Sequence, residues 1–240
     1  MSKVRIELLY PEFNHLYGDT GNIRYLCKKL HDAGCETELV QTHLQDRPAF
    51  TQGDIGFLYV GPCTERQQLL QLQALQPWKQ ALAERMDTDG VTLMTGNAFE
   101  LLGQCIRCCD GSEQPALALL PAYAQRFSRL RYNDLCVGSW QGLDIVGFKN
   151  QLSHSYLLPD GKLEAFAHMR KGCGLNPESR EEGFCRNHFF ATYLVGPLLP
   201  LNPLFADKVL GWLAPEAGEF ARLPFEQEAY ERRLREFISK

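Results

Sequence analysis

The stretch VTLMTGNAFELLG, residues 91–103, decides the fold that we expect for this chain. Gly90 introduces residues 91–95, a short apolar and β-branched run that predicts a buried strand. This strand runs straight into Gly96 and the segment behind it. The pattern predicts a sharp strand-to-helix turn at the carboxyl end of the strand.

The sequence before this stretch alternates between strand and helix patterns. Apolar runs at residues 4–10, 36–43 and 55–60 predict three strands, and the last is continuous enough for a parallel sheet covered on both faces. Apolar residues recur at helical spacing over residues 23–33 and again over residues 64–86, where a proline predicts a kink. The first half therefore predicts alternating β and α elements.

The second half changes character. Residues 144–150, 153–158 and 189–195 read as strands separated by Gly, Pro and Asn turns, and the chain closes with helices near 202–213 and 225–238. We expect one α/β domain, with a doubly wound, mostly parallel sheet, helices on both faces and extra antiparallel strands in the second half. The last helix, about residues 225–239, is expected to be an appendage of this domain, which spans residues 1–240.

Bulk composition excludes several function classes. The formal net charge is -4 and no basic cluster is visible, which argues against a nucleic-acid partner. No apolar run is long enough for a membrane span or a signal peptide. Nine cysteines without a secretory signal are typical of reduced thiols, so we expect a cytoplasmic protein.

Two loops are expected to share one crevice. In doubly wound sheets, ligands gather at the carboxyl ends of the strands, which here are residues 60–64 and 95–97. Asp19 follows the first strand and is interpreted as a helix N-cap or as an acid in the crevice. The candidate crevice residues are Asp19, Gly61, Thr95, Gly96, Asn97, Lys149, Asn150, His154 and Val195.

Four segments resemble class I glutamine amidotransferases of the cobyric acid synthase type, above all the glutaminase subunit of lipid II isoglutaminyl synthase. LYP with YGDTGN (residues 9–11 and 17–22) resembles the opening strand and loop of the family. Residues 96–103 are similar to its nucleophile turn CGGYQLLG, and GFKN (147–150) is similar to its GFEN. TYLVGPLLPLNP, residues 192–203, is similar to TYLHGPLLPKNP, with two substitutions in twelve positions.

The resemblance implies a flavodoxin-like fold and glutamine hydrolysis by a Cys nucleophile, a His base and backbone oxyanion donors. The nucleophile position falls on Gly96 and the histidine position on Val195, and neither residue can do this chemistry. Pro62 removes one backbone donor from the oxyanion loop, residues 61–64. The family's Glu-Asn-His becomes KNQ at residues 149–151.

These departures lead to three hypotheses. The first is a non-hydrolytic subunit that forms a heterodimer with a Mur-ligase-like, amide-forming enzyme in cell-wall or cobyrinate-type amidation. The second is a sensor that binds a small molecule in a crevice that Gly96, Val195 and Lys149 are expected to make roomier and more apolar, with a different charge. The third is an active glutaminase with a relocated Cys63 nucleophile, for which His154, at a position where the family has Arg, is the candidate base.

A metal site is a weaker alternative. Cys105 and Cys108 form a C-x-x-C pair, and Cys185 and His188 form a C-x-x-H pair, which together have the donors of a zinc site. Nothing in the sequence brings the two pairs together, and the family that the chain resembles has no metal in this domain. We therefore expect ordinary reduced thiols, no metal and no cofactor.

Overall fold

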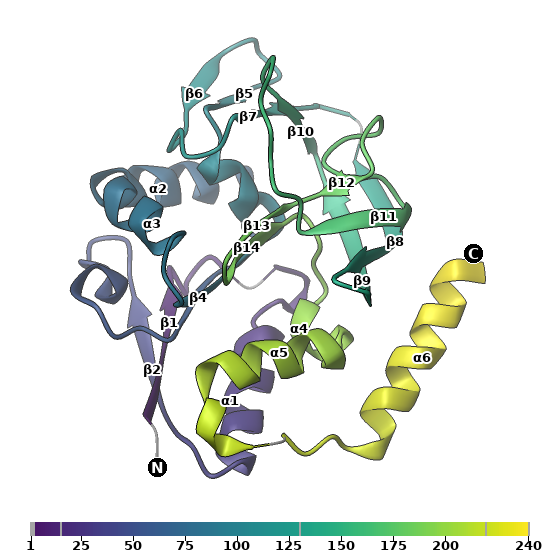
Figure 1. Cartoon of the computed structure of the whole chain (residues 1–240). Coiled ribbons are helices and arrows are strands. Elements are labelled where there is room, and N and C mark those ends of the chain that lie inside the picture. The colour runs from purple at the N-terminus through teal and green to yellow at the C-terminus, as the bar shows by residue number, and fades with distance from the viewer. Residues whose placement is uncertain (1–2, 15, 130, 219, 240) are drawn as a thin grey trace.

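The computed structural model describes residues 3–14, 16–129, 131–218 and 220–239 (Figure 1). The strands are β1 (Lys3–Leu9), β2 (Glu36–Thr42), β3 (Phe57–Val60), β4 (Val91–Thr95), β5 (Cys105–Arg107), β6 (Glu113–Pro115), β7 (Ala122–Arg126), β8 (Tyr132–Trp140), β9 (Leu143–Gln151), β10 (Ser153–Leu157), β11 (Ala167–Lys171), β12 (Glu181–Glu182), β13 (Phe184–Arg186) and β14 (Phe189–Thr192). The helices are α1 (Gly21–Asp32), α2 (Glu65–Leu75), α3 (Lys79–Arg85), α4 (Leu198–Leu201), α5 (Pro203–Leu213) and α6 (Pro224–Ser239).

The largest sheet has six strands in the order β13-β14-β4-β3-β1-β2. All neighbours in it run parallel except β13 and β14, which pair antiparallel. The doubly wound, mostly parallel sheet expected from the sequence is confirmed. The expected kink at the proline of residues 64–86 is also present, because a short 3-10 helix (Gln76–Trp78) separates α2 from α3.

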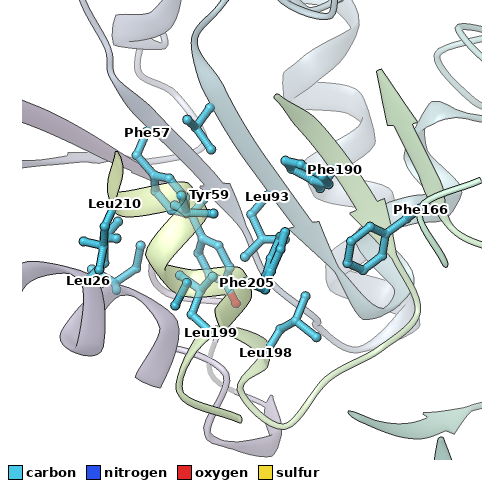
Figure 2. Packing of buried hydrophobic residues seen from close by; sticks show 14 of the residues in the cluster. Leu26, Phe57, Tyr59, Leu93, Phe166, Phe190, Leu198, Leu199, Phe205 and Leu210 are labelled. Atoms are coloured by element: carbon cyan, nitrogen blue, oxygen red, sulfur yellow. The ribbon is translucent and has the colours of Figure 1, made fainter. Parts of the chain in front are cut away.

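Side chains of the central strands alternate between two apolar clusters, one on each face of this sheet. Phe57 and Tyr59 of β3 belong to the cluster that includes residues of α1, α4 and α5 (Figure 2). Leu58 and Val60 belong to the opposite cluster, which includes residues of α2 and α3. Fully burying a side chain of this size contributes about 1.5–3 kcal/mol, so both helical layers hold the sheet in place. The carboxyl ends of β3 and β4 are thereby fixed side by side.

Two four-stranded sheets follow, with the orders β10-β7-β5-β6 and β12-β11-β8-β9. The long hairpin β8–β9 turns at Gln141 and Gly142, which both have positive φ, as a two-residue hairpin turn requires. A β-bridge between Phe148 of β9 and Val195 joins this hairpin to the loop after β14. The end of β9 is thereby held beside the carboxyl edge of the large sheet.

Helix α6 lies along the β8–β9 hairpin and forms the last element in Figure 1. Tyr230 and Phe237 are its buried side chains. At its first turn, Glu226 accepts a 2.6 Å hydrogen bond from Lys29 of α1, in an ion pair that is largely buried. Of the helices in the described residues, none has the combined length and apolarity that crossing a membrane requires.

Candidate functional site

The turn between β4 and the next helix adopts a left-handed backbone at Gly96, with φ of 61°. This conformation favours glycine, because a Cβ atom is strained there. A Cβ atom on residue 96 would also lie 2.7 Å from Pro62 Cβ and 3.2 Å from Val195 Cγ1. The expected sharp turn is present and leads into a 3-10 helix (Gly96–Leu102). The glycine does not make the crevice roomier, as the sequence had led us to expect, because apolar atoms of Pro62 and Val195 fill the space above it.

Val195 faces this turn from the loop after β14. It is buried, and its backbone exchanges two hydrogen bonds with Phe148, at 2.9 and 3.1 Å. The backbone is therefore fixed by the hairpin, and the side chain at this position has no atom that accepts a proton. Of the two positions that the resemblance assigns to chemistry, Gly96 therefore has no nucleophilic side chain and Val195 has no proton acceptor.

The loop after β3 offers few free backbone donors. Pro62 has no N–H group, and the N–H group of Cys63 is already bound by Asn97 Oδ1 at 3.1 Å. Asn97 also donates to the Cys63 carbonyl at 2.9 Å, so its amide clamps the loop from the neighbouring strand end. The Thr64 hydroxyl and the Gln67 side chain form a capping box at the start of α2. Residues 60–64 and 95–97 do meet, as expected.

Cys63 and His154 are not brought together as a pair. Burial, with the nearby charges of Glu100 and Glu65, raises the pKa of the Cys63 thiol to about 12, and Arg126 opposes this only weakly. A catalytic thiol needs the opposite shift. The described residues place no hydrogen bond between the two side chains.

His154 is instead enclosed by other aromatic rings. Its ring packs against Phe127 and Tyr132, with centroids 5.5 and 5.6 Å away. Burial, followed by the positive charge of Lys149, lowers the pKa of His154. The imidazole is therefore neutral at physiological pH and supplies no positive charge that would activate a thiol.

A cavity of about 320 Å³ lies at the carboxyl ends of β3 and β4. Of the residues expected in the crevice, Gly96, Asn97 and Asn150 line it, and so does Cys63. Sequence reasoning missed the polar residues of its inner wall, Glu100 among them. The cavity is lined by Leu16, Tyr17, Pro62, Cys63, Thr64, Glu65, Gly96, Asn97, Glu100, Arg131, Asn150, Gln151, Leu152, Ser153 and Tyr193.

Glu100 is the buried carboxyl group of this wall. It is 2% exposed, and burial raises its pKa, although hydrogen bonds from Ser153 and Gln68, the positive charge of Arg126 and a hydrogen bond from Tyr193 oppose the shift. The sequence signal was available, because a glutamate between Phe99 and two leucines follows an apolar stretch that is otherwise a core segment. A charged residue in such an apolar run is a candidate for a buried functional residue.

Asp19 is neither a helix cap nor a wall of the crevice. It is fully buried, and the residue at the N-cap of α1 is Thr20. The Asp19 carboxylate accepts hydrogen bonds from the hydroxyls of Tyr59 and Thr95 and, at 3.0 Å, from the backbone N–H of Gly196. Burial raises its pKa against these bonds. Asp19 therefore links the loop after β1 to the carboxyl end of β4 and to the loop after β14, which contains Val195.

Thr95 and Gly61, also expected in the crevice, are buried with Asp19. A Cβ atom on Gly61 would lie 2.9 Å from the Tyr59 hydroxyl and 3.1 Å from Asn14 Cβ, so the glycine allows this close packing. Neither residue lines the cavity. Their role in the structure is support of the strand ends.

Lys149 does not change the charge of the crevice as expected. Its side chain is 0% exposed and forms an ion pair with Glu182, which is also 0% exposed. The ammonium also donates to the Gly174 carbonyl, and Glu182 accepts from Thr192 Oγ1 at 2.8 Å and from Tyr193 N at 2.7 Å. Because the charge is paired inside the fold, an altered crevice charge must come from other residues.

An open groove of about 540 Å³ adjoins the cavity on the side of the β8–β9 hairpin. Val195, Phe148, Leu135 and Tyr17 give it an apolar surface, and Asn150 lies between the groove and the cavity. The Tyr17 hydroxyl donates to the Asn150 carbonyl at 3.1 Å, which marks the border between them.

The two cysteine and histidine pairs belong to different sheets. Cys105 lies on β5 of the second sheet, whereas Cys185 lies on β13 of the large sheet. The His188 ring stacks on Trp212, with centroids 4.0 Å apart, and its Nδ1 is 3.0 Å from the Asp89 carbonyl. Within the described ranges, no three His, Cys, Asp or Glu residues are grouped to hold a metal ion.

Comparison with known proteins shows which proteins this chain is similar to. No protein-family model matches the chain. The lipid II isoglutaminyl synthase (glutamine-hydrolyzing) subunit GatD of Staphylococcus aureus (strain N315) is 28% identical over 212 residues, which cover 88% of this chain and 83% of that protein. The subunit of the same name from Streptococcus pneumoniae (strain ATCC BAA-255 / R6) is 26% identical over 245 residues, covering 99% and 90%.

Solved structures of glutamine amidotransferases are similar to this chain in fold. A crystal structure of a glutamine amidotransferase superposes with a TM-score of 0.54 at 15% identity, covering 87% of this chain and 99% of that one. A glutamine amidotransferase from Thermotoga maritima gives a TM-score of 0.52 at 11% identity, covering 98% and 96%. The chain therefore has the fold of the class I glutamine amidotransferases, and its sequence is similar to the GatD subunits of lipid II isoglutaminyl synthase.

Proposed function

We propose that this chain is a non-hydrolytic subunit, which keeps the glutamine amidotransferase fold but does not hydrolyse glutamine. The observation that carries the proposal is the filled space at Gly96, where Pro62 and Val195 lie 2.7 and 3.2 Å from the position of a Cβ atom. A nucleophilic side chain would need this space to reach a bound amide. The site therefore lacks both the nucleophile and the room for it.

The remaining chemistry is missing as well. Hydrolysis of glutamine needs a base that takes the thiol proton and backbone donors that stabilise the oxyanion. Val195 cannot act as a base, Pro62 has no N–H, and the N–H of Cys63 is bound by Asn97. Members of such a catalytic unit act together, so losing several of them removes essentially all turnover.

Partnership with an amide-forming enzyme completes the proposal. The GatD relatives are subunits of a synthase, which supports a role for this chain inside an assembly. We propose an ATP-dependent, Mur-ligase-like partner in cell-wall or cobyrinate-type amidation. Affinity purification of the tagged chain from its native host, followed by mass spectrometry, tests the pairing. Recovery of such a ligase supports it, and repeated recovery without any ligase contradicts it.

Restoring the chemistry tests the loss of hydrolysis. The variant Gly96→Cys is expected to stay inactive, because the Pro62 ring occupies the space of the new side chain and no base is present. The triple variant Pro62→Gly, Gly96→Cys, Val195→His supplies the space, the nucleophile and the base. Glutamate release by the triple variant, together with its absence in the parent chain, is the expected result.

The cavity supports a second role, which is binding of a small molecule. Its volume of about 320 Å³ is at the lower end of the range for ligand sites, and its inner wall carries buried polar groups. Thermal unfolding in the presence of amino acids and nucleotides tests this role, since a ligand that binds only the folded state raises the unfolding temperature. The absence of any shift across such a set contradicts it.

A further inference from the structure

The inner wall of the cavity presents hydrogen-bond acceptors that lack a charged partner. Glu100 and Gln151 are 2% and 7% exposed, and both line the cavity. None of the residues that the structure describes forms a salt bridge to Glu100. The Gln151 Oε1 atom is buried and has no hydrogen-bond partner within the described part of the chain. Two acceptors at one cavity wall predict a ligand that brings donors to them.

The hydrogen bonds to Glu100 come from neutral groups. Gln68 Nε2 donates at 3.0 Å to Oε2, while the Ser153 hydroxyl and, at 3.3 Å, the Tyr193 hydroxyl donate to Oε1. The guanidinium of Arg126 donates to Gln68 Oε1, so the Gln68 amide lies between this cation and Glu100. These donors stabilise a carboxylate without neutralising its charge, which a bound cation would do.

The orientation of the Gln151 amide is set by its other end. Its Nε2 donates to the Ser153 carbonyl at 2.6 Å and lies 3.4 Å from His154 Nδ1. This contact turns Oε1 away from the Ser153 carbonyl and leaves it without a donor. An N–H group of a ligand would satisfy it.

A different part of the cavity wall offers a cation, which can bind an anionic group of a ligand. Arg131 lines the cavity, is exposed, and donates to the Asn150 side chain. The charged lining residues are Arg131, Glu65 and Glu100, and Arg131 is the cation among them. A ligand that meets the buried wall with a cation can therefore place an anionic group on Arg131, whose guanidinium favours carboxylates.

We propose that this cavity binds a short amino acid with a cationic side chain, its side-chain ammonium at Glu100 and Gln151 and its α-carboxylate at Arg131. The inference rests on the proposed ligand-binding role of the cavity and specifies the ligand class. A neutral amide or an anionic end fits this wall less well, because burial raises the pKa of Glu100 and a second cation beside it, in addition to Arg126, would stabilise its ionised form.

Three amino acids of equal chain length test this directly: L-ornithine, L-glutamine and L-glutamate, whose ends are cationic, neutral and anionic. Calorimetric titration of the full chain is expected to give at least about tenfold tighter binding of ornithine than of glutamine, and no binding of glutamate. Glu100→Gln is expected to remove this preference, and Arg131→Ala to weaken ornithine and glutamine alike. The exposed Arg129→Ala is the matched control, since Arg129 does not line the cavity.

A second variant guards against a folding defect of Glu100→Gln. Gln151→Leu removes the unpartnered acceptor and keeps the buried volume, and it is expected to weaken ornithine binding while thermal unfolding stays cooperative. Equal binding of ornithine and glutamine to the parent chain would overturn the cationic class and leave the ligand-binding role standing. If none of the three amino acids binds, the ligand class is rejected, and the binding role of the cavity is then decided by the wider thermal-unfolding set of amino acids and nucleotides. Hydrolysis of glutamine during titration would instead contradict the non-hydrolytic proposal.

Discussion

The Cβ atom of Pro62 lies 2.7 Å from the position that a Cβ atom would take on Gly96. The two residues belong to the loops after β3 and β4, and the parallel pairing of these strands sets their distance. The contact links two substitutions that are separate in the sequence. A proline in the first loop is compatible only with a glycine, or with a displaced backbone, in the second.

Gly96→Ala is expected to lower the free energy of unfolding more than a matched glycine substitution. Gly34→Ala is the control, because Gly34 also has positive φ, 78°, but has no atom within 4 Å of its Cβ position. Both variants carry the backbone strain, and overpacking against Pro62 adds about 1–3 kcal/mol at residue 96 alone. Urea unfolding measures the free energy of unfolding of both variants. Adding Pro62→Gly to Gly96→Ala should bring its loss closer to that of Gly34→Ala. Equal losses in the two variants would show that the space above Gly96 is open.

Cys63 is expected to be unreactive in the folded chain. Burial raises the pKa of its thiol to about 12, so the thiolate is rare at neutral pH. Alkylation followed by peptide mapping should modify the exposed Cys109 first and Cys63 only after unfolding in denaturant. Modification of Cys63 ahead of Cys109 in the native chain would revive a catalytic role for it.

Asp19 predicts a specific dependence of stability on pH. Burial raises the pKa of its carboxyl group above the ordinary 3.8, so folding favours the protonated form. Its stabilising contribution is complete below the ordinary pKa and is lost as the pH rises through the raised one. The unfolding free energy of the parent chain relative to Asp19→Asn should therefore fall as the pH rises above the ordinary pKa of 3.8. A constant or rising difference would mean that the hydrogen bonds to Asp19 outweigh burial.

The buried pair of Lys149 and Glu182 is expected to be costly to break. Lys149→Met leaves the Glu182 carboxylate buried without its cation, which should cost about 3–5 kcal/mol in the free energy of unfolding. The double variant with Glu182→Gln keeps an oxygen for the Thr192 and Tyr193 donors and should recover part of the loss. Lys208→Met, at an exposed position, should change stability by about 0.5 kcal/mol or less. A loss in Lys149→Met as small as that control would contradict the buried pair.

Much of the architecture could be predicted from the sequence, because its signals are local. The strand of residues 91–95, the turn at Gly96 and the broken helix near residues 64–86 follow from apolar periodicity, glycine and proline. The short strands β5, β6 and β13 could not be predicted, since three residues do not establish an alternating pattern. Their pairing depends on partners far away in the chain.

The site was predictable only where a motif marks it. Gly96, Asn97 and Asn150 line the cavity as expected, whereas Lys149 and Asp19 are buried beneath it. Charged residues are normally exposed, so only their tertiary partners explain this burial. The partner of Lys149 is 33 positions away and the Gly196 donor to Asp19 is 177 positions away, and no local pattern connects them.

Release of glutamate from L-glutamine shows directly whether this chain hydrolyses glutamine. The purified chain, alone and with any ligase that copurifies with it, is expected to release no more glutamate than a reaction without the chain. The same result is expected for Cys63→Ala. Release of glutamate by the parent chain would contradict the proposed loss of hydrolysis. If Cys63→Ala abolishes this activity, Cys63 is a relocated nucleophile. If the activity persists in Cys63→Ala, the nucleophile lies at neither Cys63 nor Gly96, and the assignment of the nucleophile position to Gly96 is wrong.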